Sequence, residues 1–380
     1  MLKKAISIFL AALAATALPG AAHAQAAAPS VSAKSAVVVS EDDGRVLYEK
    51  NSRERLPIAS TTKIMTALLT LEAASRGDRT ILITPEMVRV EGSSMGLKAG
   101  DKLTLTALAE GMLSASGNDA ANSAAIAVGG SVRKFAELMN RKAAGLGLSE
   151  THYVTPSGLD DAEHYSSAGD LAKLTSAALK NPAFAKIVSQ KKIRVHFSSP
   201  DRTVVYTNHN KLLSFYKGCN GVKTGFTKKA GRCLVSSAER GGVRLVAVTL
   251  CDPNDWEDHE KLLNYGFSRL TRYRADDSGV RLGLPVVGGT KSRILVTGSA
   301  GKAVLLSPEN VQNLRRTVEL PQFVYAPVPK GRTLGQIRYS DGLGTVVTTK
   351  LAAGEEIPRQ TVRKDIIQKF WDRIRQLLSA

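Results

Sequence analysis

The hydrophobic pattern changes three times along the first 270 residues of the chain. Residues 36–48 carry two alternating apolar runs around an Asp-Asp-Gly turn, which predicts a β-hairpin. From residue 59 to about residue 185 the apolar positions recur at helical spacing, with Ile64, Leu68 and Leu71 on one face. Alternating apolar runs then return at residues 193–196, 204–206, 222–224, 232–236 and 245–250, before a last helical run at 261–270. A sheet interrupted by a helical insertion indicates an α+β domain rather than a repeating βαβ unit.

The last hundred residues follow a different pattern. Residues 281–348 form short alternating segments cut by Gly and Pro, with a helix expected only at 309–314, which predicts a separate small β-sandwich beginning near Asp276. Residues 361–380 then place six apolar side chains on one helical stripe, Val362, Ile366, Phe370, Ile374, Leu377 and Leu378. We therefore expect an α+β domain at 33–272, a small all-β domain at 276–358 and an amphipathic helix at 360–380.

The amino terminus indicates export. Lys3 and Lys4 precede an apolar run at residues 5–18, and small residues at Ala22 and Ala24 fit a signal-peptide cleavage site after Ala24. The run is too short to cross a bilayer as an anchor. We therefore expect a signal peptide at 1–24 and a periplasmic or otherwise extracytoplasmic mature protein.

Composition narrows the partners of such a chain. With 43% apolar and 23% charged residues the chain is a folded globular one, and 52 basic against 34 acidic residues give a net charge of +18, which falls to +16 when Lys3 and Lys4 are removed. Export and a 5% aromatic content argue against a nucleic-acid partner. The six histidines and three cysteines form no cluster with zinc-ligand spacing, so we expect neither a metal nor a cofactor.

The three cysteines argue against a disulfide-built scaffold. Because their number is odd, at least one thiol of Cys219, Cys233 and Cys251 is left over. If Gly225 and Gly231 face each other across a hairpin, Cys219 lies about 13 Å along its strand from the position that faces Cys233. That separation exceeds the reach of a disulfide, so a Cys219–Cys233 bridge is not expected.

Three short motifs carry candidate chemistry. Ser60 and Lys63 stand at i and i+3 at the start of a helix, so they share a face and the amine can reach the hydroxyl. Ser116 and Asn118 lie between two helical runs, where such residues are also ordinary loop and cap residues. The third motif is Lys223, Thr224 and Gly225, on a strand where the glycine leaves room for a ligand backbone.

Each motif is common when taken alone, whereas S-x-x-K, S-x-N and K-T-G in this order are the set of the penicillin-recognising serine enzymes. The stretches IASTTKIMTALL, MLSASGNDAANSAA, TPSGLDDAEHYS, TNHNKLL and GVKTGFTKKAG carry the resemblance further. The chain resembles a low-molecular-mass penicillin-binding protein, a D-alanyl-D-alanine carboxypeptidase of the serine peptidase family typified by penicillin-binding protein 5. The resemblance covers most of the mature chain and is weakest over the β-rich domain.

The resemblance implies a β-lactamase/transpeptidase-like catalytic domain and a role for each motif residue. Ser60 would attack the carbonyl between two D-alanines of the peptidoglycan stem peptide while an uncharged Lys63 takes its proton. Ser116 would return a proton to the leaving amine, and Asn118 would orient Lys63 and the substrate. The backbone N–H groups of Ser60 and Phe226 would stabilise the developing oxyanion, and Lys223 and Thr224 would hold the terminal carboxylate, beside Gly225. β-Lactams would acylate Ser60.

Three other functions share part of this pattern. A serine β-lactamase uses the same motifs, and residues 260–264 fit the E-x-x-L-N string of one lactamase class, but they follow the K-T-G motif instead of preceding it. The motifs do not separate a carboxypeptidase from a D,D-endopeptidase of the same family. A non-catalytic wall-binding protein would not need all three. The sequence leaves open whether the third residue of the stem peptide is diaminopimelate or lysine.

The C-terminal helix suggests how the protein is attached. At 1.5 Å per residue it is about 30 Å long, but five basic residues interrupt it, so we expect it to lie in the membrane interface with Phe370 and Trp371 among the headgroups. A helix packed on its own protein has the same stripe and is the alternative. The family resemblance favours peripheral attachment to the cytoplasmic membrane, and anionic phospholipid would account for part of the positive charge.

Overall fold

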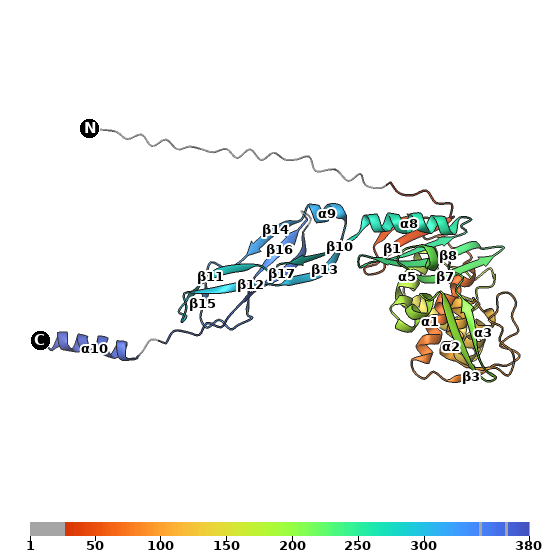
Figure 1. The fold of residues 1–380 in the computed structure, drawn as a ribbon, viewed down its shortest axis with the longest axis horizontal. Coiled ribbons are helices and arrows are strands. Elements are labelled where there is room, and N and C mark those ends of the chain that lie inside the picture. Colours follow the sequence, from red (N-terminus) through yellow and green to blue (C-terminus); the bar gives the residue numbers. More distant parts are fainter. Residues whose placement is uncertain (1–26, 342–343, 362–363, 380) are drawn as a thin grey trace, which may run out of the picture.

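The computed structural model describes residues 27–341, 344–361 and 364–379. The expected signal peptide and its cleavage site after Ala24 lie outside the described residues. Figure 1 shows a larger body of helices around a sheet, followed along the long axis by a β-rich body and then by a separate helix at the carboxyl end.

A five-stranded antiparallel sheet forms the centre of the larger body, in the order β2-β1-β9-β8-β7. The expected hairpin is present as its first two strands. The five strands are β1 (Ser35–Ser40), β2 (Val46–Lys50), β7 (Cys219–Thr227), β8 (Gly231–Arg240) and β9 (Val243–Leu250). The strand β7 lies at one edge, and that edge meets the turn that carries Ser60.

Helices cover both faces of this sheet. On one face lies α8 (Asp255–Arg269), and on the other lies α5 (Ala168–Leu179), against which the rest of the helical insertion packs (Figure 1). Because side chains alternate along a strand, Val37 and Val39 enter the core beneath the insertion, whereas Val38 enters the core beneath α8. This two-sided cover explains why every residue of β1 is buried.

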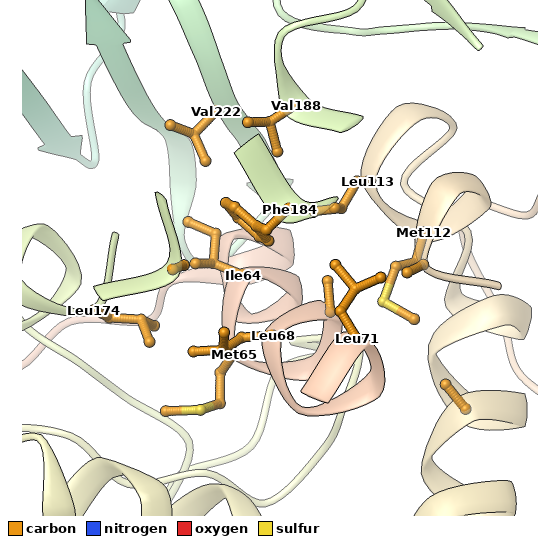
Figure 2. Packing of buried hydrophobic residues seen from close by; sticks show 14 of the residues in the cluster. Ile64, Met65, Leu68, Leu71, Met112, Leu113, Leu174, Phe184, Val188 and Val222 are labelled. Carbon is orange, nitrogen blue, oxygen red and sulfur yellow. The ribbon is translucent and has the colours of Figure 1, made fainter. Parts of the chain in front are cut away.

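The helical insertion surrounds a nearly apolar central helix, α1 (Lys63–Ala74). Ile64, Met65, Leu68 and Leu71 of α1 are buried against Phe184, Leu113 and other apolar side chains (Figure 2). Its partners are α2 (Leu105–Ser114), α3 (Asn118–Gly129), α4 (Val132–Gly145) and α6 (Pro182–Val188). Since residues 63–68 of α1 are all buried, the amino end of the helix is held firmly.

Two hairpins lie apart from the central sheet. One joins β3 (Thr80–Leu82) to β4 (Lys102–Thr104), and the other joins β5 (Lys192–Ser198) to β6 (Asp201–Thr207). The strands expected at 193–196 and 204–206 are therefore real but pair only with each other. A single turn, α7 (Leu212–Phe215), leads from β6 into β7.

The β-rich body contains two sheets. The larger has six strands in the order β14-β16-β17-β12-β11-β15, and the smaller joins β10 to β13. Its elements are β10 (Thr271–Asp276), β11 (Arg281–Val287), β12 (Arg293–Gly298), β13 (Ala300–Leu306), α9 (Pro308–Gln312), β14 (Arg315–Glu319), β15 (Val324–Tyr325), β16 (Thr333–Ser340) and β17 (Thr345–Ala353). A separate apolar core around Val296, Ile337 and Leu351 fills it. The catalytic-type α+β body and the all-β body confirm the expected fold class.

The last described element is α10 (Lys364–Leu378). Its apolar side chains Ile366, Phe370, Trp371 and Leu377 are exposed. Among the described residues, no helix is both long and apolar enough to cross a membrane.

The β7–β8 register corrects one assumption about the cysteines. Thr227 faces Gly231 and Gly225 faces Cys233, so the two glycines do not face each other. Cys219 therefore lies six residues, about 20 Å, along β7 from the position facing Cys233. The turn is tighter than the glycines suggested, and the expectation of no Cys219–Cys233 bridge is met with a larger margin. All three cysteines are free thiols in the described residues.

Candidate active site

Ser60 lies on a single 3₁₀ turn, Ala59–Thr62, that runs directly into α1. The residue before it, Ala59, adopts a left-handed conformation with φ of 46°, which turns the chain sharply and presents Ser60 at the helix start. Lys63 follows one turn later and is completely buried, with its Nζ 2.8 Å from the Ser60 Oγ. The spacing in sequence therefore does bring the amine to the hydroxyl.

Two further oxygens surround the Lys63 amine. Its Nζ donates to the Asn118 Oδ1 at 2.7 Å and to the carbonyl oxygen of Ser157 at 2.7 Å. Burial, and then the positive charge of Lys223, lower the pKa of Lys63 well below its ordinary value of 10.5. A neutral amine has two N–H groups and one lone pair. Because the amide and carbonyl oxygens can only accept, an uncharged Lys63 amine would give both N–H groups to them and keep its lone pair for the Ser60 hydroxyl.

Ser116 and Lys223 form a second pair. Ser116 occupies the tight turn between α2 and α3, with φ of 58°, and the Lys223 Nζ donates to its Oγ at 3.0 Å. Lys223 is buried at the middle of β7 and also donates to the carbonyl oxygen of Thr224 at 2.8 Å. Burial lowers the pKa of Lys223 from 10.5 to about 7. Both amines are thus adapted to lose their protons more readily than an exposed lysine.

The edge strand β7 comes close to Ser60 only because of Gly225. A Cβ added to Gly225 would stand 3.1 Å from the backbone nitrogen of Ser60 and 3.1 Å from the carbonyl oxygen of Ile58. Glycine therefore permits the strand to pack against the turn. The next residue, Phe226, has its side chain 66% exposed at the mouth of the site.

These residues border an open cleft of about 450 Å³. Of the eight predicted site residues, Ser60, Ser116, Thr224, Gly225 and Phe226 line it. Lys63, Asn118 and Lys223 are buried behind the cleft wall and reach it through the two serine hydroxyls. All eight thus converge on one site, although they come from segments up to 166 residues apart in the sequence. The described residues contain no group of three or more His, Cys, Asp or Glu side chains arranged to hold a metal.

Comparisons with known proteins agree with this geometry. The sequence model of a peptidase family described as D-alanyl-D-alanine carboxypeptidase matches residues 22–254. The chain belongs to this family. It is 32% identical over 338 residues to the D-alanyl-D-alanine carboxypeptidase DacF of Bacillus subtilis, with 86% of each chain covered. It is also 35% identical over 343 residues to DacC of Escherichia coli, which covers 84% of this chain and 82% of that one.

Solved structures show how far the family likeness extends. Penicillin binding protein 5 of Haemophilus influenzae is 26% identical and superposes with a TM-score of 0.65, covering 88% of this chain and all of that one. The DD-transpeptidase of Streptomyces K15 is 33% identical with a TM-score of 0.61, but it covers only 64% of this chain while 99% of its own length is matched. The likeness to this transpeptidase therefore extends over less of the chain than the likeness to penicillin binding protein 5.

Sequence reasoning gave no role to the residues that support the motif in this family member. His164 is buried, and its Nδ1 accepts hydrogen bonds from the backbone N–H groups of Val154 at 3.0 Å and Thr155 at 3.2 Å. Since Nδ1 accepts twice, the ring proton is on Nε2, which lies 2.8 Å from the Thr62 Oγ1. Thr62 in turn donates to the carbonyl oxygen of Ala59 at 2.8 Å.

This chain of hydrogen bonds joins the loop that presents the Ser157 carbonyl to the turn that presents Ser60. Gly158, with φ of 84°, fits only because it has no side chain: a Cβ there would stand 1.9 Å from the Ala59 oxygen. The stretch TPSGLDDAEHYS contained these residues, but nothing in its pattern distinguished a supporting histidine from an ordinary buried one.

Other cleft residues were given no role from the sequence, although His209 and Lys211 lie in the stretch TNHNKLL that carries the family resemblance. Ser93, His209 and Lys211 line one part of the cleft wall, and Arg232, Asp255 and Trp256 line another. Glu260, the candidate lactamase glutamate, is exposed on α8 and is not one of the residues that line the cleft.

Proposed function

We propose that this chain is a serine-type D-Ala-D-Ala carboxypeptidase that releases the terminal D-alanine from peptidoglycan stem pentapeptides through an acyl-enzyme on Ser60. The observation that carries the proposal is the buried Lys63 amine, which lies 2.8 Å from the Ser60 Oγ and also donates to two oxygens that can only accept. An alcohol is a poor nucleophile until a base takes its proton, and this arrangement supplies the base.

Acylation begins when the Lys63 lone pair takes the Ser60 proton. The Ser60 Oγ then forms a bond to the carbonyl carbon of the penultimate D-alanine, and the carbonyl oxygen becomes negative. The backbone N–H groups of Ser60 and Phe226 stabilise this oxyanion, since Gly225 holds β7 against the Ser60 turn. Asn118 keeps Lys63 in place throughout.

Collapse of this intermediate breaks the peptide C–N bond. The departing nitrogen takes a proton delivered through the Ser116 hydroxyl, which the Lys223 ammonium hydrogen-bonds and can replenish. Terminal D-alanine leaves with its carboxylate near Thr224 and the positive charge of Lys223. A water molecule then adds to the ester carbon, and its proton passes through the Ser116 hydroxyl back to Lys223. The bond to the Ser60 Oγ breaks, and Lys63 returns the proton that it took from this oxygen.

A β-lactam follows the same first step, but its ring nitrogen stays attached to the acyl group and blocks the exit. We therefore expect fluorescent penicillin to label the purified protein at Ser60. Ser60→Ala should not be labelled, and Ser116→Ala should be labelled more slowly. Equal labelling of the wild type and Ser60→Ala would refute the proposal.

Two assays separate the alternatives. Release of D-alanine from a soluble pentapeptide excludes a purely binding role, and release from the pentapeptide without cleavage of cross-linked dimers excludes an endopeptidase. Rapid turnover of penicillin would indicate a β-lactamase. The exposed position of Glu260 on α8 argues against that class, because it does not border the acylated serine.

The same proposal includes the location. A mature chain that begins after Ala24 would work outside the cytoplasm, with α10 lying in the interface of the cytoplasmic membrane. The support is the exposed apolar stripe of α10, which includes Phe370 and Trp371, together with the basic residues Lys369, Arg373 and Arg375 on the same helix.

A further inference from the structure

The active-site cleft has two charged ends, separated along β7. His209 and Lys211 lie at the end of the cleft near Lys223. Asn210, between them in the sequence, donates to the Gly221 carbonyl oxygen on β7. Burial lowers the pKa of His209, and the positive charge of Lys223 lowers it further. Arg232 belongs to the other end, since it faces Phe226 across the β7–β8 ladder. Ser60 and Gly225 lie between the two ends.

The end beyond Phe226 is both acidic and basic. The Arg232 Nε and Nη2 donate to the Asp255 Oδ1 at 3.0 Å and 2.6 Å, and the Trp256 backbone N–H donates to the same oxygen at 3.0 Å. The guanidinium carbon lies 5.7 Å from the centre of the Trp256 ring. All three residues line the cleft.

This arrangement leaves one nitrogen of the guanidinium and one oxygen of the carboxylate without a hydrogen-bond partner among the described residues. They are the Arg232 Nη1 and the Asp255 Oδ2. The Arg232 side chain is 43% exposed, whereas that of Asp255 is 4% exposed, so the cation projects into the cleft and the carboxylate forms its floor. A ligand that carries a carboxylate and an ammonium on one carbon can pair with both, the carboxylate with Arg232 and the ammonium with Asp255. A ligand with only one of these charges can pair with only one of the two residues.

The direction of the substrate brings the stem peptide to this end. In the proposed reaction the leaving D-alanine lies toward Lys223 and Thr224, so the acylating part of the peptide runs the other way, past Phe226. Its third residue lies about 3.4 Å further along an extended chain than the acylating D-alanine, and neighbouring strands are about 4.8 Å apart. Arg232 faces Phe226 from the neighbouring strand and lines the cleft, so the third side chain would pass close to it.

We propose that Arg232, Asp255 and Trp256 form a subsite for the third residue of the stem peptide, and that they select diaminopimelate over lysine. The diaminopimelate side chain ends in a carboxylate and an ammonium, which pair with Arg232 and Asp255 while its methylenes lie on Trp256. A lysine side chain offers an ammonium for Asp255 but no carboxylate for Arg232, so the guanidinium is left without its partner and beside a like charge. The inference rests on the proposed carboxypeptidase function and supplies the substrate class that the sequence left open.

The test measures kcat/KM for D-alanine release from two pentapeptides that are identical except for diaminopimelate or lysine at the third position. We expect the wild type to prefer the diaminopimelate peptide by about tenfold or more, the size of one charge-assisted contact. In Arg232→Gln this ratio should fall to about one. Asp255→Asn keeps the acceptor for Arg232 and Trp256 but loses the charge for the ammonium that both peptides carry, so kcat/KM should fall for both peptides while the ratio stays above one.

Arg240→Gln is the matched control. Arg240 is at the other end of β8, where it lies over the rings of Tyr216 and Phe267, so its loss should leave the ratio unchanged. Melting temperatures show whether each variant is folded, and the wild-type ratio is a test that needs no variant. Equal kcat/KM for both peptides, or an unchanged preference in folded Arg232→Gln, would overturn the subsite. Failure to release D-alanine from either peptide, with no penicillin labelling, would instead refute the carboxypeptidase function.

Discussion

The hydrogen-bond chain through His164 makes the stability of the catalytic body depend on pH. Burial lowers the pKa of His164 from 6.5 to about 4 in the folded protein. The geometry explains the direction, because a proton on Nδ1 would face the N–H groups of Val154 and Thr155, which now donate to that atom. We therefore compare how the free energy of unfolding of the wild type and of His164→Asn changes as the pH is lowered.

The sign follows from linkage. At pH values between about 4, the pKa of His164 in the folded protein, and about 6.5, its pKa in the unfolded chain, His164 is protonated in the unfolded chain and neutral in the folded protein. This contribution is fully present above about pH 6.5 and is lost as the pH falls toward about 4. Over that interval the two pKa values give a loss of about 3 kcal/mol in the free energy of unfolding. His164→Asn is less stable at neutral pH, but it lacks this part of the pH dependence.

The assay is urea unfolding at a series of pH values. Trp371→Phe in both proteins leaves Trp256 as the fluorescent reporter of the α+β body, since the chain has two tryptophans. His259, whose pKa is lowered to about 3 by burial, acts equally in both proteins and cancels in the difference. His196→Asn, at an exposed position on β5, is the control and should keep the wild-type slope. If the free energy of unfolding of the wild type and of His164→Asn fell in parallel as the pH is lowered, the assigned tautomer and the free-energy cost of protonating His164 would be refuted.

Three further outcomes test other parts of the structure. Gly158→Ala should abolish acylation or folding, because its Cβ would stand 1.9 Å from the Ala59 oxygen. The control Gly147→Ala is also at positive φ but has open space around it, so it should lower the free energy of unfolding by only about 1 kcal/mol. A normal acylation rate in Gly158→Ala would contradict the close packing of Gly158 on Ala59. Lys63→Ala should slow penicillin acylation at least ~100-fold, and in the wild type the rate should fall as the pH drops through the lowered pKa of Lys63; stopped-flow labelling that finds neither would remove Lys63 as the base. Truncation after Pro358 should move the protein from the membrane pellet to the soluble fraction with unchanged D-alanine release, and persistent pelleting would contradict attachment through α10.

The position of His164 should affect catalysis as well as stability. His164 touches neither Ser60 nor Lys63, but it fixes Thr62 on one side and the loop before Ser157 on the other. Since the Ser157 carbonyl takes one of the two N–H groups of Lys63, a shift of this loop would leave the amine free to turn away from Ser60. We therefore expect His164→Asn to acylate more slowly even at neutral pH, where it is still folded.

Local pattern was enough for much of the fold. The hairpin at β1 and β2, the apolar face of α1 and the helices on either side of Ser116 all follow from periodicity, which depends on which face of an element is buried. Pairing could not be obtained in this way. The separate β5–β6 hairpin and the true β7–β8 register depend on which strands meet in space, and Gly225 and Gly231 do not face each other across their hairpin as their spacing suggested.

The sequence by itself determined the chemistry: a serine and a lysine one helical turn apart, and two further motifs in the order that one class of enzyme uses. Only the tertiary structure decided the state in which these residues work. Burial is a property of the packed protein, and it is burial that lowers the pKa values of Lys63 and Lys223. The supporting His164 and the Arg232–Asp255 pair likewise gain their roles from neighbours that are distant in sequence, which no local pattern encodes.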